Sequence, residues 1–297
     1  MAKPLDLFWW SPRRDAKLRM KELRANYSTW FRMKLAGGEA LTNFGDELSP
    51  LVLQYATGRK VRWAAADRAE VIAVGSILEY VDRRTQSDPW LWGTGLRADL
   101  RAKAVPRIAV NPERVLAVRG PRTQKELGLS SELPIGDPGV LAPELGNFQG
   151  LKRSGTLFIP HFRTWSTPAG RKHLQTARSL GYGVANPSLH PVEMISLIAR
   201  ADFVLSSSLH GVVVAHSLGI PAQLVGIPTG GRTEPEFKYR DYYESVKVPF
   251  SSIELSSALQ PGQRDTLLAL HESTSSLAQA NCRELAGQLT TAIHKLR

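Results

Sequence analysis

The feature that most constrains the fold of this chain is an alternation of short apolar runs with helical patterns. In the first half, LDLFWW (5–10), VIAVGSIL (71–78) and WLWGTGL (90–96) have the composition of buried strands. FGDELSPLVLQYAT (44–57) has the periodicity of a helix with an acidic first turn. Apolar strands that end in small residues and lead into helices are typical of parallel βαβ units.

The second half repeats this alternation. TLFIPHF (156–162), DFVLSSS (202–208) and IPAQLVG (220–226) are expected strands with helical patterns between them. The stretch 140–154, VLAPELGNFQGLKRSG, is rich in Gly, Pro and polar residues, and we interpret it as a linker. The sequence therefore predicts two αβα domains that face each other across a cleft.

We expect the first domain to span residues 1–145 and the second to span residues 146–297. Residues 264–296 have the pattern of a C-terminal helical pair, which could pack back on the first domain. Open α/β sheets bind ligands at the carboxyl ends of their strands. The loops that follow the strands are therefore the expected place for a site.

Length and composition narrow the class of protein. The chain has 297 residues, of which 42% are hydrophobic, which is enough for two packed domains. It has no run of about 18 apolar residues, and its first residues are interpreted as a strand and not as a signal peptide. A single cysteine, Cys282, excludes an internal disulfide and suits a reducing compartment. We expect a cytoplasmic protein, with a position at the inner face of the membrane left open.

The formal net charge of +11 indicates an anionic partner. Acidic small substrates are favoured, a membrane or lipid-linked substrate comes next, and nucleic acid comes last. The basic residues form short clusters, such as Lys17–Arg24 and Arg114–Arg122, without an aromatic–basic RNA-binding signature. Nucleic acid is therefore not an expected partner.

The stretch SSSLHG places small polar residues and a histidine where a strand meets a helix. A helix N-terminus offers free N–H groups and the positive end of the helix dipole to phosphate or carboxylate. We expect Ser207, Ser208 and Leu209 to bind a substrate anion and His210 to be catalytic, the alternative for His210 being a core histidine. His216 lies about 240° around the helix from His210, so we expect it to pack in the core or at an interface.

Two arginines follow another expected strand, in AVRGPRT. Arginine suits bidentate binding of carboxylate or phosphate, and the position favours Arg119 over Arg122 as a substrate-binding residue. The alternative for each is a solvated surface arginine. FKYRDYY offers Lys238 and Arg240, in what we expect to be a loop after a strand, with an exposed basic loop as the alternative.

Further candidates lie at the starts of helices and the ends of strands. NFGDEL puts Asn43 and Asp46 at the entry to a helix, where either could cap it. Asn43 is otherwise expected to bind substrate, and Asp46 to act as a base or to bind a hydroxyl at the cleft. Gly75 is expected to let the backbone approach a ligand, although no complete nucleotide-binding motif surrounds it. His161 ends a strand, where a functional and a structural role are equally open. Asp137, in the turn signature GDPG, is expected to be structural.

Together these motifs resemble one family. The ordered set NFGDELSP, VGSIL, WGTG, AVRGPRT, GDPGVLAPEL, IPHF, SSSLHGVVVAHSLGIP and FKYRDYYES, over roughly residues 40–250, resembles the polysaccharide pyruvyl transferases. Each motif is weak alone, and their order gives the match its specificity. The resemblance implies two Rossmann-like αβα domains in a GT-B-like arrangement. It also implies transfer of the enolpyruvyl group of phosphoenolpyruvate to a sugar, which forms a pyruvate ketal and releases phosphate.

The resemblance assigns the family's strand-end arginine to Arg119, its histidine to His210 and its downstream lysine to Lys238. Many relatives carry arginine directly before the Leu-His pair, where this chain has Ser208. The helix N–H groups could carry more of the phosphate in its place. A substitute cation is otherwise expected among Arg122, Arg163 and Arg240.

In the implied reaction, protonated His210 donates a proton to the methylene carbon, and Asp46 or His161 takes a hydroxyl proton. No metal or cofactor is expected. The expected partners are phosphoenolpyruvate and a sugar acceptor, with lipid linkage of the sugar and peripheral membrane association left open. The first alternative is a GT-B-type glycosyltransferase that uses a nucleotide-sugar. A basic module that binds anionic glycan or nucleic acid is the last.

Overall fold

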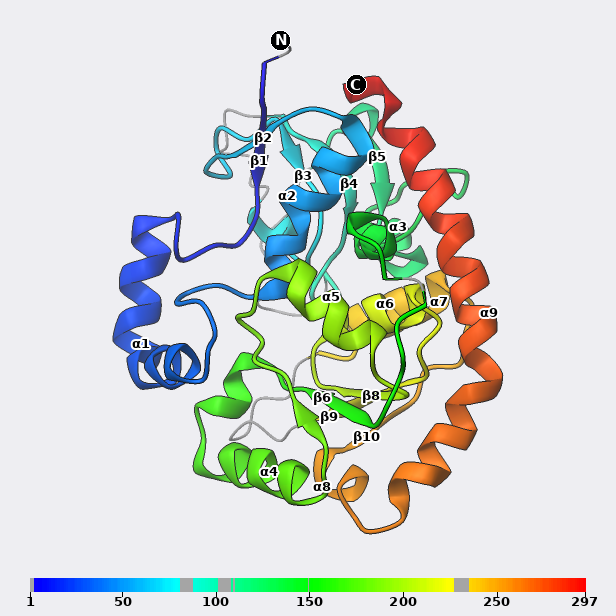
Figure 1. Cartoon of the computed structure of the whole chain (residues 1–297). Helices are drawn as coiled ribbons and strands as arrows, with labels where there is room; N and C mark the ends of the chain where they lie inside the picture. Colours follow the sequence, from blue (N-terminus) through cyan, green and yellow to red (C-terminus); the bar gives the residue numbers. More distant parts are fainter. Residues whose placement is uncertain (1–2, 81–87, 101–107, 109, 149, 227–234) are drawn as a thin grey trace.

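The structure, a computed structural model, describes residues 3–80, 88–100, 108, 110–148, 150–226 and 235–297. In these residues the chain forms two five-stranded sheets, and all of the strand pairs in them are parallel (Figure 1). The prediction of an α/β protein built on two parallel-sheet units is therefore confirmed.

The first sheet has the strand order β2-β1-β3-β4-β5 and the second has the order β10-β9-β8-β6-β7. The strands of the first are β1 (Leu5–Phe8), β2 (Val61–Trp63), β3 (Val71–Ile72), β4 (Trp90–Thr94) and β5 (Val115–Val118). Those of the second are β6 (Thr156–Ile159), β7 (Gly183–Val184), β8 (Phe203–Ser206), β9 (Ala222–Gly226) and β10 (Ser252–Glu254). All residues of β5, β6 and β8 are buried, which explains why these strands read as continuous apolar runs.

Helices connect and cover the strands. They are α1 (Ala16–Leu35), α2 (Phe44–Thr57), α3 (Pro121–Glu126), α4 (Pro168–Ser179), α5 (Pro191–Ala199), α6 (Leu209–Ser217), α7 (Phe237–Ser245), α8 (Leu255–Ala258) and α9 (Gln263–Ala292). Short 3₁₀ helices are η1 (Leu78–Tyr80), η2 (Pro112–Arg114), η3 (Pro138–Leu145), η4 (Phe162–Trp165) and η5 (Ile293–Leu296). α2 ends at Gly58, whose φ of 68° gives the left-handed cap that glycine adopts without strain.

The two units share one packed core. α2 from the first unit contacts α5 and α6 from the second, and η3 packs against both α2 and α6. Val140 and Leu141 of η3 are buried in the same apolar cluster as Phe44 and Val213. The expected polar linker over 140–154 therefore begins as a buried 3₁₀ helix, because its apolar residues fill the space between the units.

The C-terminal segment forms one long helix followed by a 3₁₀ turn, so the expected helical pair is wrong. α9 runs along both units (Figure 1). Its Leu289 carbonyl accepts a hydrogen bond of 3.0 Å from the Trp92 indole of the first unit. Its His271 imidazole lies 2.7 Å from the Gln223 amide oxygen of the second.

Two further helices depart from expectation. α7 replaces the loop expected around Lys238 and Arg240. α1, which the sequence pattern did not predict, stands at one flank of the molecule and kinks at Asn26 (Figure 1). It is attached to the second unit, where Asn186 donates a hydrogen bond of 2.7 Å to the carbonyl of Met33. Among the described residues, no helix has both the length and the apolar character needed to cross a membrane.

Candidate active site between the two sheets

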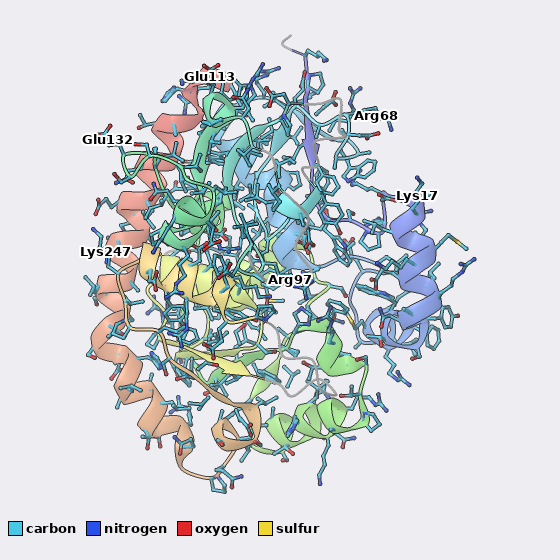
Figure 2. All side chains as sticks on the ribbon, turned by 180° about the vertical axis from the view of Figure 1, so that it is seen from behind. Lys17, Arg68, Arg97, Glu113, Glu132 and Lys247 are labelled. Carbon is cyan, nitrogen blue, oxygen red and sulfur yellow. The ribbon has the colours of Figure 1, made fainter. Side chains whose placement is uncertain are left out.

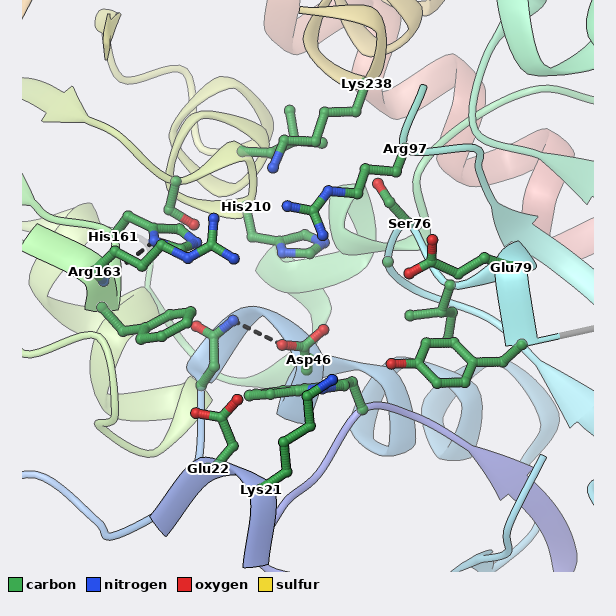
Figure 3. Close-up of a pocket in the computed structure, with 18 residues that line it drawn as sticks. Lys21, Glu22, Asp46, Ser76, Glu79, Arg97, His161, Arg163, His210 and Lys238 are labelled. Atoms are coloured by element: carbon green, nitrogen blue, oxygen red, sulfur yellow. Dashed lines mark hydrogen bonds between the residues drawn. The ribbon is translucent and has the colours of Figure 1, made fainter. Parts of the chain in front are cut away.

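A cavity of about 330 Å³ opens between the two units, beside the segments that follow β3 and β8. This is where open parallel sheets place their ligands. Side chains from both units point into the cavity (Figure 3). Most of the residues predicted from the sequence line it: Asn43, Asp46, Gly75, His161, Arg163, Ser208, Leu209, His210 and Lys238.

The turn between β8 and α6 brings His210 to the cavity. The hydroxyl of Ser206 accepts a hydrogen bond from the Ser208 amide at 3.1 Å and donates one to the Ser208 carbonyl at 2.8 Å. This closes the turn, so α6 begins at Leu209 with its first residues on the cavity wall. The N–H groups of a first helical turn have no partner within the helix and can bind an anion.

The His210 ring packs closely between α2 and Asp137. A Cβ atom added to Gly45 would lie only 2.2 Å from His210 Nδ1, so the imidazole packs on the bare backbone of α2. On its other side, Nε2 lies 3.8 Å from Oδ2 of Asp137, which is fully buried. Neither of these two atoms has a hydrogen-bond partner among the residues that the structure describes.

The groups around His210 have opposite effects on its pKa. Burial lowers the pKa of His210 below its ordinary value, Asp137 raises it, and Lys238 and Arg119 lower it further. The net effect is a lowered pKa, which favours the neutral form of the ring. An anion bound beside it would favour the charged form and raise this pKa.

Asp46 lies across the cavity from the basic side chains. Asn43 precedes α2 but makes no capping bond with its side chain; its amide donates to Asp46 Oδ2 at 2.7 Å. Burial raises the pKa of Asp46 to about 7, although the Asn43 hydrogen bond and Lys238 lower it. A carboxyl group with a pKa near the working pH is suited to general acid–base catalysis.

Four basic side chains reach the cavity, three from helices and one from the segment that follows β4. Figure 3 shows Lys238 of α7, Arg97, Arg163 of η4 and Lys21 of α1 directed towards the space in front of His210. Glu22, Asp46 and Glu79 are the acidic residues in the lining. The cations face His210 from several sides, as the binding of a compact, multiply charged anion requires.

Arg119, which we expected to bind substrate, is not among the residues that line the cavity. Its side chain is fully buried and forms an ion pair with Asp241 at 3.0 Å. It also donates hydrogen bonds of 2.6 Å to the Ser76 hydroxyl and to the Leu96 carbonyl. Ser76 lines the cavity, so Arg119 contacts a residue of the cavity wall from behind.

Ser207 and His216 also lie outside the cavity lining. The Ser207 hydroxyl accepts a hydrogen bond of 2.7 Å from the His161 amide, so it holds the neighbouring loop. His216 is buried, and its Nδ1 lies 3.2 Å from the Tyr242 hydroxyl. Burial lowers the pKa of His216 to about 3, so it is a neutral core histidine. The two histidines of α6 thus occupy different environments, as their helical spacing predicts.

Sequence reasoning missed several residues of this site. Asp137 was expected only to shape a turn, and its Oδ1 does accept the Gly139 amide at 2.9 Å, but its Oδ2 faces His210. Gly45 stands in a recognised motif, and its position one residue before Asp46 was the available signal. Lys21 lies in the basic cluster Lys17–Arg24 and Arg97 closely follows the WGTG motif, but neither signal placed these side chains at the cavity, because long-range packing sets the position of both segments.

The fold and the pocket define an α/β protein of two parallel-sheet units with a group of basic side chains gathered between them. The profile of the polysaccharide pyruvyl transferase family matches residues 43–226, more than half of the chain. The chain belongs to this family, as the order of its motifs predicted.

One similar protein is the succinoglycan biosynthesis protein ExoV of Rhizobium meliloti (strain 1021). It is 25% identical over 228 residues, which cover 70% of this chain and 63% of that protein. The chain thus matches less than two thirds of the length of this relative.

Comparison with solved structures gives two matches at low similarity. The wall teichoic acid polymerase TagF has a TM-score of 0.46 at 10% identity, with 96% of each chain covered. The glycotransferase of kitacinnamycin has a TM-score of 0.35 at 12% identity, with 81% of this chain and 69% of that chain covered.

Proposed function

We propose that this protein transfers the enolpyruvyl group of phosphoenolpyruvate to a sugar of a glycan or glycan precursor and forms a pyruvate ketal. Two sugar hydroxyls add to C2, the methylene carbon gains one proton to become a methyl group, and the C2–O bond to phosphate breaks. One hydroxyl proton is thus matched by the proton gained at carbon, and the other leaves with phosphate. The observation that carries the proposal is His210, packed against Gly45 and Asp137 and facing four basic side chains.

The donor fits the basic side of the pocket. The N–H groups at the start of α6, together with Arg163 and Lys238, form a seat for phosphate and carboxylate around His210. Ser208 stands where many relatives have arginine. Of the proposed substitutes, Arg163 lines the pocket, whereas Arg122 is paired with Glu244 outside it. Arg240, paired with Glu236, also lies outside the lining.

His210 is the proposed acid that protonates the methylene carbon. Its lowered pKa means that it must gain a proton when the donor binds. The negative charges of phosphoenolpyruvate favour this uptake, and Asp137 stabilises the resulting imidazolium from the opposite side. Protonation at carbon makes C2 cationic and open to attack. General acid catalysis of this kind contributes about 100- to 10,000-fold.

Asp46 is the proposed base for the attacking hydroxyl. It lies across the pocket from Lys238 (Figure 3), the side on which we place the sugar. With a pKa of about 7, a large fraction of it is deprotonated at neutral pH and can accept the proton. His161 lines the same cavity, and its Nδ1 accepts a hydrogen bond of 3.3 Å from the Arg163 amide.

The test measures phosphate release from phosphoenolpyruvate with a panel of methyl hexosides. His210→Ala should reduce the rate by at least about 100-fold while the far-ultraviolet circular dichroism stays unchanged. His173→Ala on α4, remote from the cavity lining, is the matched control and should keep the wild-type rate. A wild-type rate in His210→Ala would refute the acid assignment.

Ligand protection against thermal unfolding separates the two transferase classes. Phosphoenolpyruvate should raise the melting temperature, and a panel of nucleotide-sugars should not. Protection by a nucleotide-sugar without protection by phosphoenolpyruvate would instead identify a glycosyltransferase.

A further inference from the structure

Exposed apolar side chains gather on α1. Within the described part of the chain, seven large hydrophobic residues are strongly exposed, and four of them belong to this one helix. They are Met20 (52% exposed), Tyr27 (64%), Phe31 (51%) and Leu35 (73%). A group of this size on one surface element indicates an interaction site.

The second half of the helix has apolar side chains on its solvent-facing side. Tyr27, Phe31 and Leu35 recur every fourth residue and fall within about 80° of one another at 100° per residue. The opposite side of the helix is buried against the second unit and carries Thr29, Trp30 and Met33. The apolar stripe therefore faces away from the protein, and the Tyr27 and Phe31 rings stack with their centroids 6.2 Å apart.

The charged residues of α1 are almost all basic. The helix has six basic residues and one acidic residue, Glu22, whose carboxylate accepts hydrogen bonds from Asn26 and Trp30 within the same helix. The exposed basic side chains are Lys17, Arg19, Lys21, Arg24 and Lys34. Figure 2 shows the helix, with Lys17 labelled, at the flank of the molecule and its side chains extending outward.

We propose that this face of α1 binds the surface of an anionic lipid membrane. The exposed side of α1 carries both apolar and basic side chains, and a surface helix that carries both binds anionic membranes through buried apolar area and charge attraction. Tyrosine and other amphipathic rings are favoured at headgroup level, and each basic residue near an anionic surface contributes about 1 kcal/mol. Charge selects this partner over a second copy of the chain, because a copy would bring the same positive charge to the contact.

The same helix supplies Lys21 and Glu22 to the cavity. Membrane contact through α1 would therefore bring the pocket close to the lipid headgroups. If the proposed transfer function holds, this placement suits an acceptor sugar that is carried on a lipid, and membrane binding itself does not depend on that function.

The experiment is cosedimentation of the whole protein with phosphatidylcholine vesicles, with and without phosphatidylglycerol. Wild-type protein should bind only the anionic vesicles and should be released by added salt. Lys17→Gln/Arg24→Gln should weaken binding by about fivefold for each charge removed. Phe31→Ser/Leu35→Ser should weaken it by at least about tenfold. Leu270→Ser/Leu277→Ser, which removes similarly exposed leucines from α9, is the control and should bind as wild type.

Each other outcome overturns the proposal. Absence of wild-type binding to anionic vesicles would do so directly. Retained binding in both α1 variants would place the lipid contact on another surface. A concentration-dependent dimer that dissociates in Phe31→Ser/Leu35→Ser, without vesicle binding, would make the stripe a contact between two copies. Melting temperatures and circular dichroism of the variants confirm that each is folded.

Discussion

Replacing Gly45 by alanine tests the position of the His210 ring directly. Gly45 is a helical residue of α2 without a positive φ, so alanine suits its backbone. In an isolated helix this change would stabilise by about 0.8–1 kcal/mol. The added methyl group would however lie 2.2 Å from His210 Nδ1, 2.7 Å from Cγ and 3.0 Å from Cβ.

The size of the effect follows from these distances. An ordinary contact is about 3.5 Å, so the imidazole must retreat by more than about 1 Å. Contact with Cβ as well as the ring means that a rotation about χ1 alone does not relieve the overlap. Overpacking of this kind costs about 1–3 kcal/mol, and a displacement of about 1 Å in a catalytic group costs about 100-fold in rate.

The assay combines thermal unfolding with phosphate release, and Gly287→Ala is the matched control. Gly287 is also helical, and a Cβ there would meet nothing within 4 Å. Gly287→Ala should keep full activity and gain stability, whereas Gly45→Ala should lose both. If Gly45→Ala matches the control in melting temperature and rate, the imidazole does not pack on α2 as described and the reasoning fails.

Three further variants test the charges around this site. Asp137→Asn removes the group that raises the pKa of His210, so the loss of activity with rising pH should begin at lower pH, with a rate at least about tenfold lower at neutral pH; an unchanged pH profile of phosphate release would contradict this. His216 has a folded pKa of about 3 against an ordinary 6.5, so the unfolded chain binds an extra proton between these values and the free energy of unfolding should fall as pH drops through that window. His216→Asn should flatten this dependence in denaturant titrations, and an unchanged slope would count against it. Arg119→Met should lower the free energy of unfolding by about 3–5 kcal/mol in the same titrations, because it leaves the buried Asp241 carboxylate unpaired. A decrease of less than about 1 kcal/mol would show that the ion pair does not stabilise the fold.

Prediction from the sequence was most accurate for segments whose local pattern agrees with their place in the folded protein. α2 occurs at the predicted residues 44–57, because its apolar periodicity matches its burial between the units. The turn at SSSLHG was predicted in place and in kind, since a strand, small polar residues and a helix are local features. The predictions of two parallel-sheet units and of a pocket between them both depended on these segments. The structure has both sheets, and residues of these segments line the pocket.

Prediction failed where distant contacts decide the outcome. The sequence of α1 lacks the apolar stripe by which a helix that packs on the protein core is recognised. Its apolar stripe faces solvent, and only a few of its residues pack on the second unit. Arg97 closely follows the WGTG motif, but long-range packing brings it to the cavity. The function of Asp137 as a neighbour of His210 depends on packing between residues 73 positions apart, which turn chemistry does not reveal.

Arg119 shows how a family motif can contribute to a site from outside the cavity lining. A Cβ on Gly95 would lie 2.5 Å from the Arg119 guanidinium carbon, and one on Gly120 would lie 1.9 Å from the Asp241 carbonyl. The glycines of WGTG and AVRG thus make room for one buried ion pair, which also holds the Ser76 hydroxyl.

Loss of activity in an Arg119 variant therefore does not by itself identify a substrate contact. Asp241 is also fixed by the Thr123 amide at 2.9 Å and the Thr123 hydroxyl at 2.7 Å, so an unpaired carboxylate would stay buried. The double variant Arg119→Met/Asp241→Leu separates the two cases, because removing both charges should recover much of the stability lost in Arg119→Met. Recovery of phosphate release along with stability would show that Arg119 positions the wall, whereas stability without activity would require the guanidinium to act on the substrate.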